Sequence, residues 1–323
     1  MEEPTAATLL ARAAALYGVG HADLTPLGAF ESDVYSFDGP NGPSILKVIA
    51  QEHRDPGQVQ AEVDWLLALI EEGVPVAAPL PATTGRHVEY LPDHERVLIA
   101  FRRAPGVTTR PVDWTDERLE SWGELLGRLH AHSRTWSPPG ERRRTLAQQS
   151  YAVNAAEVMP DDPGFTRAAL ELLDAAAPLL SHGPDSGLIH ADLHHGNMLL
   201  HEGSWTAIDF DDCSYGSYAF DLAMPLYYMV KAQRAVPAEE AAARFLPPFL
   251  AGFRRYAPDP LGGAEAVAAC LNLRQAELVV ALRTKLSDDR WTDYLREVEV
   301  MLRTAVTQGE EVLSVAALRR WLE

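Results

Sequence analysis

The sequence predicts an α+β fold in which strands are concentrated in the first third of the chain and helices dominate the rest. Three observations support this prediction. Segments rich in β-branched and aromatic residues, separated by Gly and Pro turns, recur before residue 103. Long segments with apolar residues at helical spacing follow from residue 116 onward. Between these helices, the stretch 188–221 combines His, Asp and Asn residues with two short apolar runs.

The first third begins with an Ala- and Leu-rich helix over Ala6–Tyr17, which Gly18 and Gly20 end. A second helix is predicted over Val59–Glu71, where Val63, Leu66, Leu67 and Ile70 recur near helical spacing. The strands predicted in this region are Leu24–Leu27, Val34–Phe37, Ser44–Ala50, Arg86–Tyr90 and Arg96–Phe101.

Lys47 stands out in the strand Ser44–Ala50 because it is the one charge in an apolar segment. Side chains alternate between the two faces of a strand, so Ile45, Lys47 and Ile49 share one face. An ammonium group on a half-buried face requires a partner. Glu62, in the first half of the following helix, is the candidate for that ion pair, and a solvated carboxylate is the alternative.

Helices account for most of the chain beyond residue 116. The helix Asp116–Ser133 carries an apolar stripe and has His130 near its end, a position where histidine usually has a structural role. The further helices predicted are Ala168–Leu180, Ala219–Val230, Glu239–Tyr256, Ala264–Leu286, and Asp289–Glu323 with breaks.

The stretch 188–221 contains the residues that carry chemistry. His190, Asp192 and Asn197 have the spacing H-x-D-x-x-x-x-N, which is that of a protein-kinase catalytic loop. Two short strands, Met198–Leu200 and Trp205–Phe210, follow and are joined by a Gly-containing turn, so we expect the apolar strand with Asp209 to return beside Asn197. Phosphoryl transfer uses one carboxylate for the acceptor hydroxyl, with an amide oxygen and a second carboxylate for Mg²⁺.

The segments IHADLHHGN, IDFDD and FDLA resemble the aminoglycoside phosphotransferase group of kinases. That group also includes choline, homoserine and methylthioribose kinases and a bacterial stress-response Ser/Thr kinase branch. The resemblance implies a bilobed protein-kinase-like fold that uses ATP and Mg²⁺. Its smaller lobe, built on an antiparallel sheet, would span residues 1–103, and its larger, mostly helical lobe would span residues 104–323.

The resemblance also implies roles for individual residues. Asp192 matches the catalytic base, and Asn197 and Asp209 match the metal ligands. Asp211 is expected to assist the metal site or to orient its loop, and His194 to touch the γ-phosphate or the acceptor. The resemblance makes His190 a packing residue that fixes the loop.

Further positions are implied for the nucleotide. Lys47 would contact the phosphates of ATP while paired with Glu62. Gly28 is the single glycine where a Gly-rich loop would have three, so an ordinary hairpin remains an alternative there. We expect backbone N–H groups near Phe30–Ser32 to approach the nucleotide, and backbone groups around Phe101–Arg103 to contact the adenine edge.

The amino-acid composition limits the classes of molecule that the protein is expected to bind. The net charge of −18, from 28 basic and 46 acidic residues, makes nucleic acid an improbable partner, because a phosphate-binding surface should be basic. The acidic excess either serves solubility or attracts a cationic acceptor. Two cysteines form no disulfide framework. We find no targeting segment and no apolar run of membrane-spanning length, so we expect a cytoplasmic monomer or homodimer.

We therefore predict an ATP- and Mg²⁺-dependent kinase for a hydroxyl group of a small molecule, such as an aminoglycoside, aminosugar or amino alcohol. The phrase FDDCSYG followed by FDLA also fits the stress-response protein kinases, which keeps a protein acceptor as an alternative. A second alternative is a nucleotide-binding regulator without catalysis. By analogy with the family, acceptor walls are expected in Arg134–Pro163 and Arg283–Trp291, and their acidic residues are candidates for holding a cation: Glu157, Asp161, Asp162, Asp288 and Asp289.

Overall fold

The computed structural model describes residues 6–28, 32–110, 113–140, 142–181, 183, 185–233, 235–257 and 262–323. These residues form two compact units. The first comprises the chain up to Gly106 together with Ser137–Arg143 and Thr206–Asp209, and the second contains the remainder. The first unit is built on an antiparallel sheet and the second is mostly helical, which confirms the predicted α+β class.

The sheet of the first unit is antiparallel throughout, with the order β1-β2-β3-β6-β4 and with β5 pairing β6 as well. In this register Lys47 of β3 lies opposite Val34 of β2 and Ile99 of β6. The turn between β2 and β3 is tight, and Gly42 adopts a φ of 88° there, which a residue with a Cβ rarely adopts. The strands are β1 Thr25–Pro26, β2 Ser32–Gly39, β3 Gly42–Ala50, β4 Pro79–Leu80, β5 Val88–Leu91 and β6 Arg96–Arg102.

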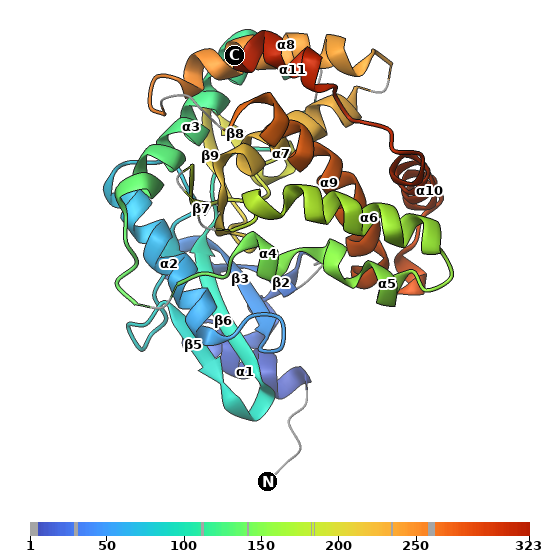
Figure 1. Ribbon diagram of the computed structural model, residues 1–323. Coiled ribbons are helices and arrows are strands. Elements are labelled where there is room, and N and C mark those ends of the chain that lie inside the picture. Colours follow the sequence, from blue (N-terminus) through green and yellow to red (C-terminus); the bar gives the residue numbers. More distant parts are fainter. Residues whose placement is uncertain are drawn as a thin grey trace. The chain divides into compact units, whose positions relative to one another are not determined.

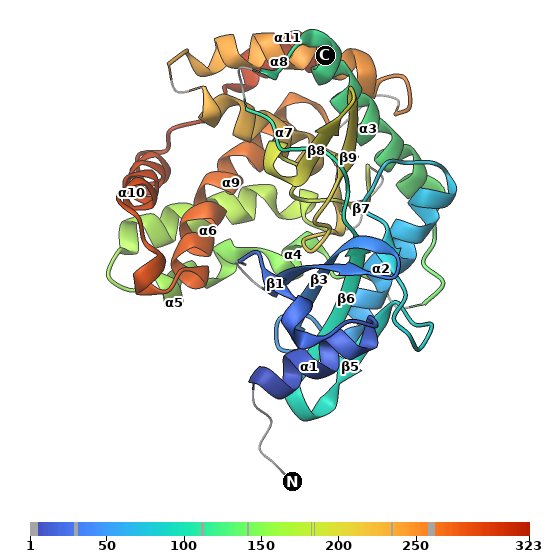
Figure 2. The ribbon, with the colours of Figure 1, turned by 180° about the vertical axis from the view of Figure 1, so that it is seen from behind.

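Helices α1 (Ala6–Leu16) and α2 (Pro56–Glu71) lie on opposite faces of this sheet (Figures 1 and 2). The face toward α1 forms a core cluster that includes Leu46 and Val48 of β3. Lys47 therefore lies on the other face, which confirms the expected alternation. Helix α2 begins three residues before the predicted start, because Asp55 caps it through the backbone N–H of Gln58 and Pro56 occupies its first turn.

Helix α9 (Gly263–Lys285) is central to the second unit and contacts α6, α7, α10 and α11. Helices α3 and α8 pack most closely, because Gly123 and Gly127 of α3 lie directly against the backbone carbonyls of Phe249 and Phe253, where a Cβ would overlap them. The other helices of this unit are α3 Asp116–Thr135, α4 Leu146–Gln149, α5 Ala155–Val158, α6 Pro163–Ala176, α7 Tyr218–Ala232, α8 Ala238–Phe253, α10 Asp293–Gln308 and α11 Val315–Leu322.

Short strands frame the stretch that carries the motif. β7 (Ser186–Ile189) pairs antiparallel with β10 (Ser214–Ser217), and β8 (Met198–His201) pairs with β9 (Ser204–Ala207). The sequence did not predict β7 or β10. The expected strand Trp205–Phe210 is also too long. Strand β9 ends at Ala207, and Asp209 lies beyond it with a φ of 63°, a left-handed conformation that no strand continues through.

Single turns of 3₁₀ helix complete the described secondary structure. They are η1 His21–Asp23, η2 Pro92–His94, η4 Tyr151–Asn154, η5 Ala177–Leu179, η6 His195–Asn197 and η7 Asp288–Arg290. Helix α6 starts five residues before its predicted start, since Asp162 caps it and Pro163 opens it. Cys213 and Cys270 are both buried, and no disulfide joins them. Within the described part of the chain, no helix has the length and apolar character needed to cross a bilayer.

Candidate active site

The loop after β7 is held in place by one buried carboxylate. Asp221 of α7 accepts hydrogen bonds from the backbone N–H groups of His190 (3.2 Å) and Ala191 (2.8 Å). Ala191 has a φ of 67°, and the bonds from Asp221 stabilise that unfavourable conformation. Asp221 also pairs with Nε2 of His130 at 3.0 Å, and both side chains are fully buried. Asp221 therefore braces the loop, and His130, for which the sequence indicated a structural role, braces Asp221.

The backbone of Asp192 is fixed within the loop itself. Its N–H donates to Nδ1 of His190 (3.3 Å), whose ring lies 4.4 Å from that of Phe210. Its carbonyl accepts from the N–H of His194 (2.8 Å) and from Nδ2 of Asn197 (3.0 Å). His190 is thus a packing residue of the loop.

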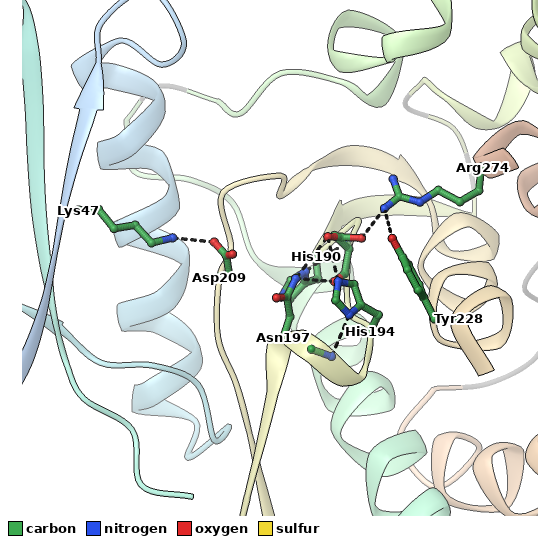
Figure 3. A network of polar contacts seen from close by, with 9 residues as sticks. Lys47, His190, His194, Asn197, Asp209, Tyr228 and Arg274 are labelled. Carbon is green, nitrogen blue, oxygen red and sulfur yellow. Dashed lines mark hydrogen bonds and ion pairs between the residues drawn. The ribbon is translucent and has the colours of Figure 1, made fainter. Parts of the chain in front are cut away.

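The two carboxylate oxygens of Asp192 have different partners (Figure 3). Oδ1 accepts from Nη2 of Arg274 at 2.7 Å. Oδ2 accepts from Nδ2 of Asn197 at 3.3 Å and lies 3.5 Å from Nε2 of His194. Burial alone would raise the pKa of Asp192, but the positive charge of Arg274, helped by His194 and His190, outweighs it and lowers that pKa to about 2. Asp192 is therefore a carboxylate at neutral pH.

His194 is oriented by its own loop. Its Nδ1 accepts from the backbone N–H of Gly196 at 2.8 Å, so the ring proton of the neutral imidazole is on Nε2, which faces Asp192. The ring lies 4.3 Å from that of Tyr228 in α7. The predicted position of His194 next to the base is consistent with this geometry, and its contact with phosphate or acceptor stays a prediction.

Sequence reasoning missed Arg274 and Tyr228. Nη2 of Arg274 donates both to Asp192 and to the hydroxyl of Tyr228, at 2.8 Å. One signal was present. Arg274 lies in a helix whose neighbouring residues Leu273, Gln275 and Ala276 are all buried, and a charge inside such a helix requires a partner. The sequence alone did not indicate which partner.

In the first unit, Nζ of Lys47 pairs with Oδ1 of Asp209 at 2.6 Å (Figure 3). The Lys47 side chain is 11% exposed and that of Asp209 is 45% exposed. The ammonium also lies 5.8 Å from the ring centre of Phe101. A strand lysine beside an accessible carboxylate is the arrangement that phosphate and a divalent metal require.

The expected pair between Lys47 and Glu62 is not the arrangement found. Oε2 of Glu62 pairs with Nη1 of Arg54 at 2.5 Å, and the Glu62 side chain is fully buried. Arg54 belongs to the segment that joins β3 to α2. It is closer in sequence to Glu62 than Lys47 is, and it forms the ion pair with Glu62. The role of Glu62 toward a nucleotide remains a prediction.

The other predicted nucleotide positions stand as follows. Gly28 has a φ of 85° and open space where a Cβ would be, and Ser32 begins β2 opposite Ile49. Phe30 lies outside the described residues. Phe101 is a buried residue of β6, and the N–H of Arg103 already donates to the carbonyl of Pro43 at 2.9 Å. The adenine contact near Phe101–Arg103 stays a prediction.

The donor atoms suit a hard divalent cation. Nδ2 of Asn197 donates to Asp192, so its Oδ1 is not used in that contact, and Asp209 has an accessible carboxylate; their role as metal ligands stays a prediction. Asp211 is half-buried in the turn in which the N–H of Cys213 bonds to the carbonyl of Phe210. Among the described residues, no group of three His, Cys, Asp or Glu side chains could hold a metal by itself, so phosphate oxygens would have to complete the ligand set.

Comparisons with known proteins agree with this geometry. The model of the phosphotransferase enzyme family matches residues 23–258. Amicoumacin kinase of Bacillus subtilis is 31% identical over 253 residues, which are 76% of this chain and 75% of that protein. Stress response kinase A of Escherichia coli is 28% identical over 212 residues, and the match spans 62% of its length.

Solved structures show the same fold over nearly the whole chain. An amicoumacin kinase in complex with AMP-PNP, Ca²⁺ and Ami has a TM-score of 0.86, with 24% identity and 98% of both chains covered. A microcompartment-associated aminopropanol kinase has a TM-score of 0.67, with 24% identity and 94% of both chains covered. From the family match and the identity to amicoumacin kinase, we conclude that this chain belongs to the phosphotransferase enzyme family and is a kinase.

Proposed function

We propose that this kinase transfers the γ-phosphoryl group of ATP, with Mg²⁺, to a hydroxyl group of a small molecule. The observation that carries the proposal is the Asp192 carboxylate. It is ionised, its backbone accepts and donates three hydrogen bonds, and the contacts of its Oδ2 with described residues are long ones, to Asn197 and His194. An acceptor hydroxyl that donates to Oδ2 would be held with its lone pair free for the phosphorus, which is the positioning that phosphoryl transfer needs.

The pKa of about 2 makes Asp192 a weak base. Its main contribution is therefore to orient the hydroxyl, and the proton passes to Oδ2 late, as the bond to phosphorus forms. Lys47 supplies positive charge to the phosphates, and Asn197 and Asp209 each offer an oxygen to Mg²⁺. Bound Mg²⁺ would neutralise charge on the phosphate oxygens.

Two findings support ATP and Mg²⁺ as the cofactors. A structurally similar kinase binds AMP-PNP and Ca²⁺. The donor atoms of Asn197 and Asp209 are all oxygens, which both Ca²⁺ and Mg²⁺ prefer. GTP in place of ATP is a direct control for the nucleotide preference.

Amicoumacin is the first acceptor to test, because amicoumacin kinase matches three quarters of this chain in sequence. Aminopropanol is the second, since an aminopropanol kinase shares the fold. A protein acceptor is less well supported, because the match to stress response kinase A covers only 63% of this chain. A regulator without catalysis would not need Lys47, Asp192, Asn197 and Asp209 together.

The charge of the acceptor is a separate question. Asp162 caps α6 and pairs with Arg303 at 2.9 Å, so it already has a structural role. The other acidic candidates are exposed side chains: Glu157, Asp161, Asp288 and Asp289. If they attract a cation, binding of an amine acceptor should weaken as salt rises, whereas binding of its neutral hydroxyl analogue should not.

The test is phosphate transfer from γ-labelled ATP to amicoumacin, an aminoglycoside, aminopropanol, choline and a generic protein, each with and without Mg²⁺. We expect a labelled small molecule with Mg²⁺ and none with the Asp192→Asn variant. Labelling of the protein alone would favour the protein-kinase alternative. Nucleotide binding without transfer to any acceptor would favour the regulator.

A further inference from the structure

The side chain of Asp192 depends on a residue from outside its loop. The loop fixes the backbone through three hydrogen bonds, but these leave rotation about the Cβ–Cγ bond undetermined. The short contact to that carboxylate comes from Arg274, at 2.7 Å. The contacts on the opposite oxygen are longer, at 3.3 and 3.5 Å, and hold the carboxylate less firmly than Arg274 does.

Arg274 itself has a second contact, to Tyr228 (Figure 3). It extends from α9, and its side chain is 12% exposed. The same Nη2 is fixed by the hydroxyl of Tyr228, and α7, which carries Tyr228, packs along α9. A guanidinium group presents its N–H donors in a fixed plane, so two acceptors at one nitrogen define its orientation.

Arg274 also lies in a setting that keeps it charged. Glu277 follows one helical turn later, buried and bonded to the hydroxyl of Ser150 at 2.7 Å. Burial would lower the pKa of Arg274, but Tyr228, Asp192 and Glu277 outweigh it and raise that pKa well above its ordinary value. The group beside Oδ1 of Asp192 is therefore a charged guanidinium, 2.7 Å away.

We propose that Arg274 is a positioning residue for the transfer reaction: by holding Oδ1 of Asp192, it presents Oδ2 to the acceptor hydroxyl. The inference rests on the proposed function, and it assigns the two oxygens different tasks. Oδ1 is the anchored atom, and Oδ2 is the atom that receives the hydroxyl. Without Arg274, the carboxylate can rotate and both oxygens compete for Asn197, His194 and the acceptor.

A purely structural role makes a different prediction. If Arg274 only compensates a buried charge, its removal should lower stability and affect every ligand alike. If it positions Asp192, its removal should lower kcat while ATP binding is kept. A misplacement of about 1 Å costs roughly 10²-fold in rate. The two roles are separable by chemical rescue, because added guanidinium can refill the cavity left by Arg274→Ala but cannot repair a misfolded unit.

The experiment compares the full-length wild type with Arg274→Ala, Arg274→Lys, Tyr228→Phe and the control Arg303→Ala. Arg303 forms an ion pair in the same unit, with Asp162, and does not touch Asp192. We measure kcat for the best acceptor, the Kd of ATP and thermal stability, each with and without millimolar guanidinium. We expect Arg274→Ala to lose about 10²-fold in kcat and to regain much of it with guanidinium.

The variants with milder changes sharpen the result. Tyr228→Phe, which removes one of the two acceptors at Nη2, should lose less than Arg274→Ala. Arg274→Lys keeps the charge but not the planar fork, so it should remain impaired. Arg303→Ala should keep the wild-type kcat and show no response to guanidinium.

Several outcomes would overturn the inference. A wild-type kcat in Arg274→Ala would do so, and so would a loss that guanidinium leaves unchanged and that Arg303→Ala shares. If Arg274→Ala does not fold, full activity of Arg274→Lys overturns it and a folded, impaired Arg274→Lys supports it. A wild type that phosphorylates no acceptor overturns the proposed function as well, which distinguishes the two failures.

Discussion

Asp209 and Asp192 are two aspartates assigned to the same reaction, and their surroundings differ strongly. Asp209 has a 45% exposed side chain and pairs with Lys47. Asp192 has a 16% exposed side chain and contacts Arg274, Asn197 and His194. Under the proposed function, the accessible carboxylate of Asp209 would exchange Lys47 for metal and phosphate, whereas the carboxylate of Asp192, which has more contacts, would orient a hydroxyl. The environment, more than the residue type, separates the two tasks.

The largest effect should follow from a change at the carboxylate of Asp192. Asp192→Asn should lower kcat by about 10²–10⁴-fold, because it removes the positioned group that receives the proton. ATP binding should change little. Steady-state kinetics and ATP titration check this, with the exposed Asp174→Asn as control. Near-wild-type turnover would remove Asp192 from its role.

The accessible carboxylate should respond to metal. Asp209→Ala is expected to abolish the Mg²⁺-dependent part of stabilisation by ATP, because the oxygen ligand is lost. The apo protein should melt close to wild type, since a partly exposed ion pair contributes little. Thermal-shift titration with ATP, with and without Mg²⁺, measures both, and Asp38→Ala serves as the control. A Mg²⁺-dependent shift of normal size would rule out Asp209 as a ligand.

A third test concerns Glu62, which we expected to pair with Lys47 and which pairs with Arg54. Glu62→Gln should reduce the free energy of unfolding by about 1–3 kcal/mol, because it weakens a charged hydrogen bond to Arg54 in a buried position. Urea denaturation measures this loss. In a double-mutant cycle on kcat, Glu62 and Lys47 should be nearly additive, since each has its own partner. Strong non-additivity would restore the pairing that the family resemblance implies.

The smallest effect should come from the buried pair of His130 and Asp221, which stabilises the loop that carries Asp192. Burial lowers the pKa of His130 below its ordinary value of 6.5, against the opposing influence of Asp221. The folded state therefore favours neutral His130, so its contribution to stability is present above about pH 6.5 and is lost as pH falls through the lowered pKa. On acidification, the Tm of the wild type should fall by a few degrees more than the Tm of His130→Gln, because the glutamine does not titrate. Parallel pH profiles of the two proteins would contradict this.

Local sequence patterns predicted the structural features that depend on residues close together in the chain. The motif from His190 to Asn197 is stabilised in part by bonds between residues at most five apart, so its spacing can be recognised in the sequence. The alternation around Lys47 was equally informative, because a strand has a period of two. The helix starts at Pro56 and Pro163 were missed although both caps, Asp55 and Asp162, stand in the sequence.

Contacts between distant residues could not be predicted in this way. Arg274 lies 82 residues after Asp192, and only the packing of α7 on α9 brings it to the loop. Glu62 forms an ion pair with Arg54, but the choice between Lys47 and Arg54 depends on where the chain between β3 and α2 passes. The left-handed backbone conformation of Asp209 could not be predicted either, because the apolar residues before it have the pattern of a strand.

The first unit is not a continuous piece of chain, and this has a consequence for how the gene can be divided. Ala207 forms two backbone hydrogen bonds with the segment around Val76. Its carbonyl accepts from the N–H of Ala77 at 2.9 Å, and its N–H donates to the carbonyl of Pro75 at 3.0 Å. Arg143 similarly donates to the carbonyl of Gln58 at 3.0 Å. A fragment that stopped at Gly106 would lack all of these partners. Exchange of the first unit between related kinases would therefore require the transfer of three separate segments.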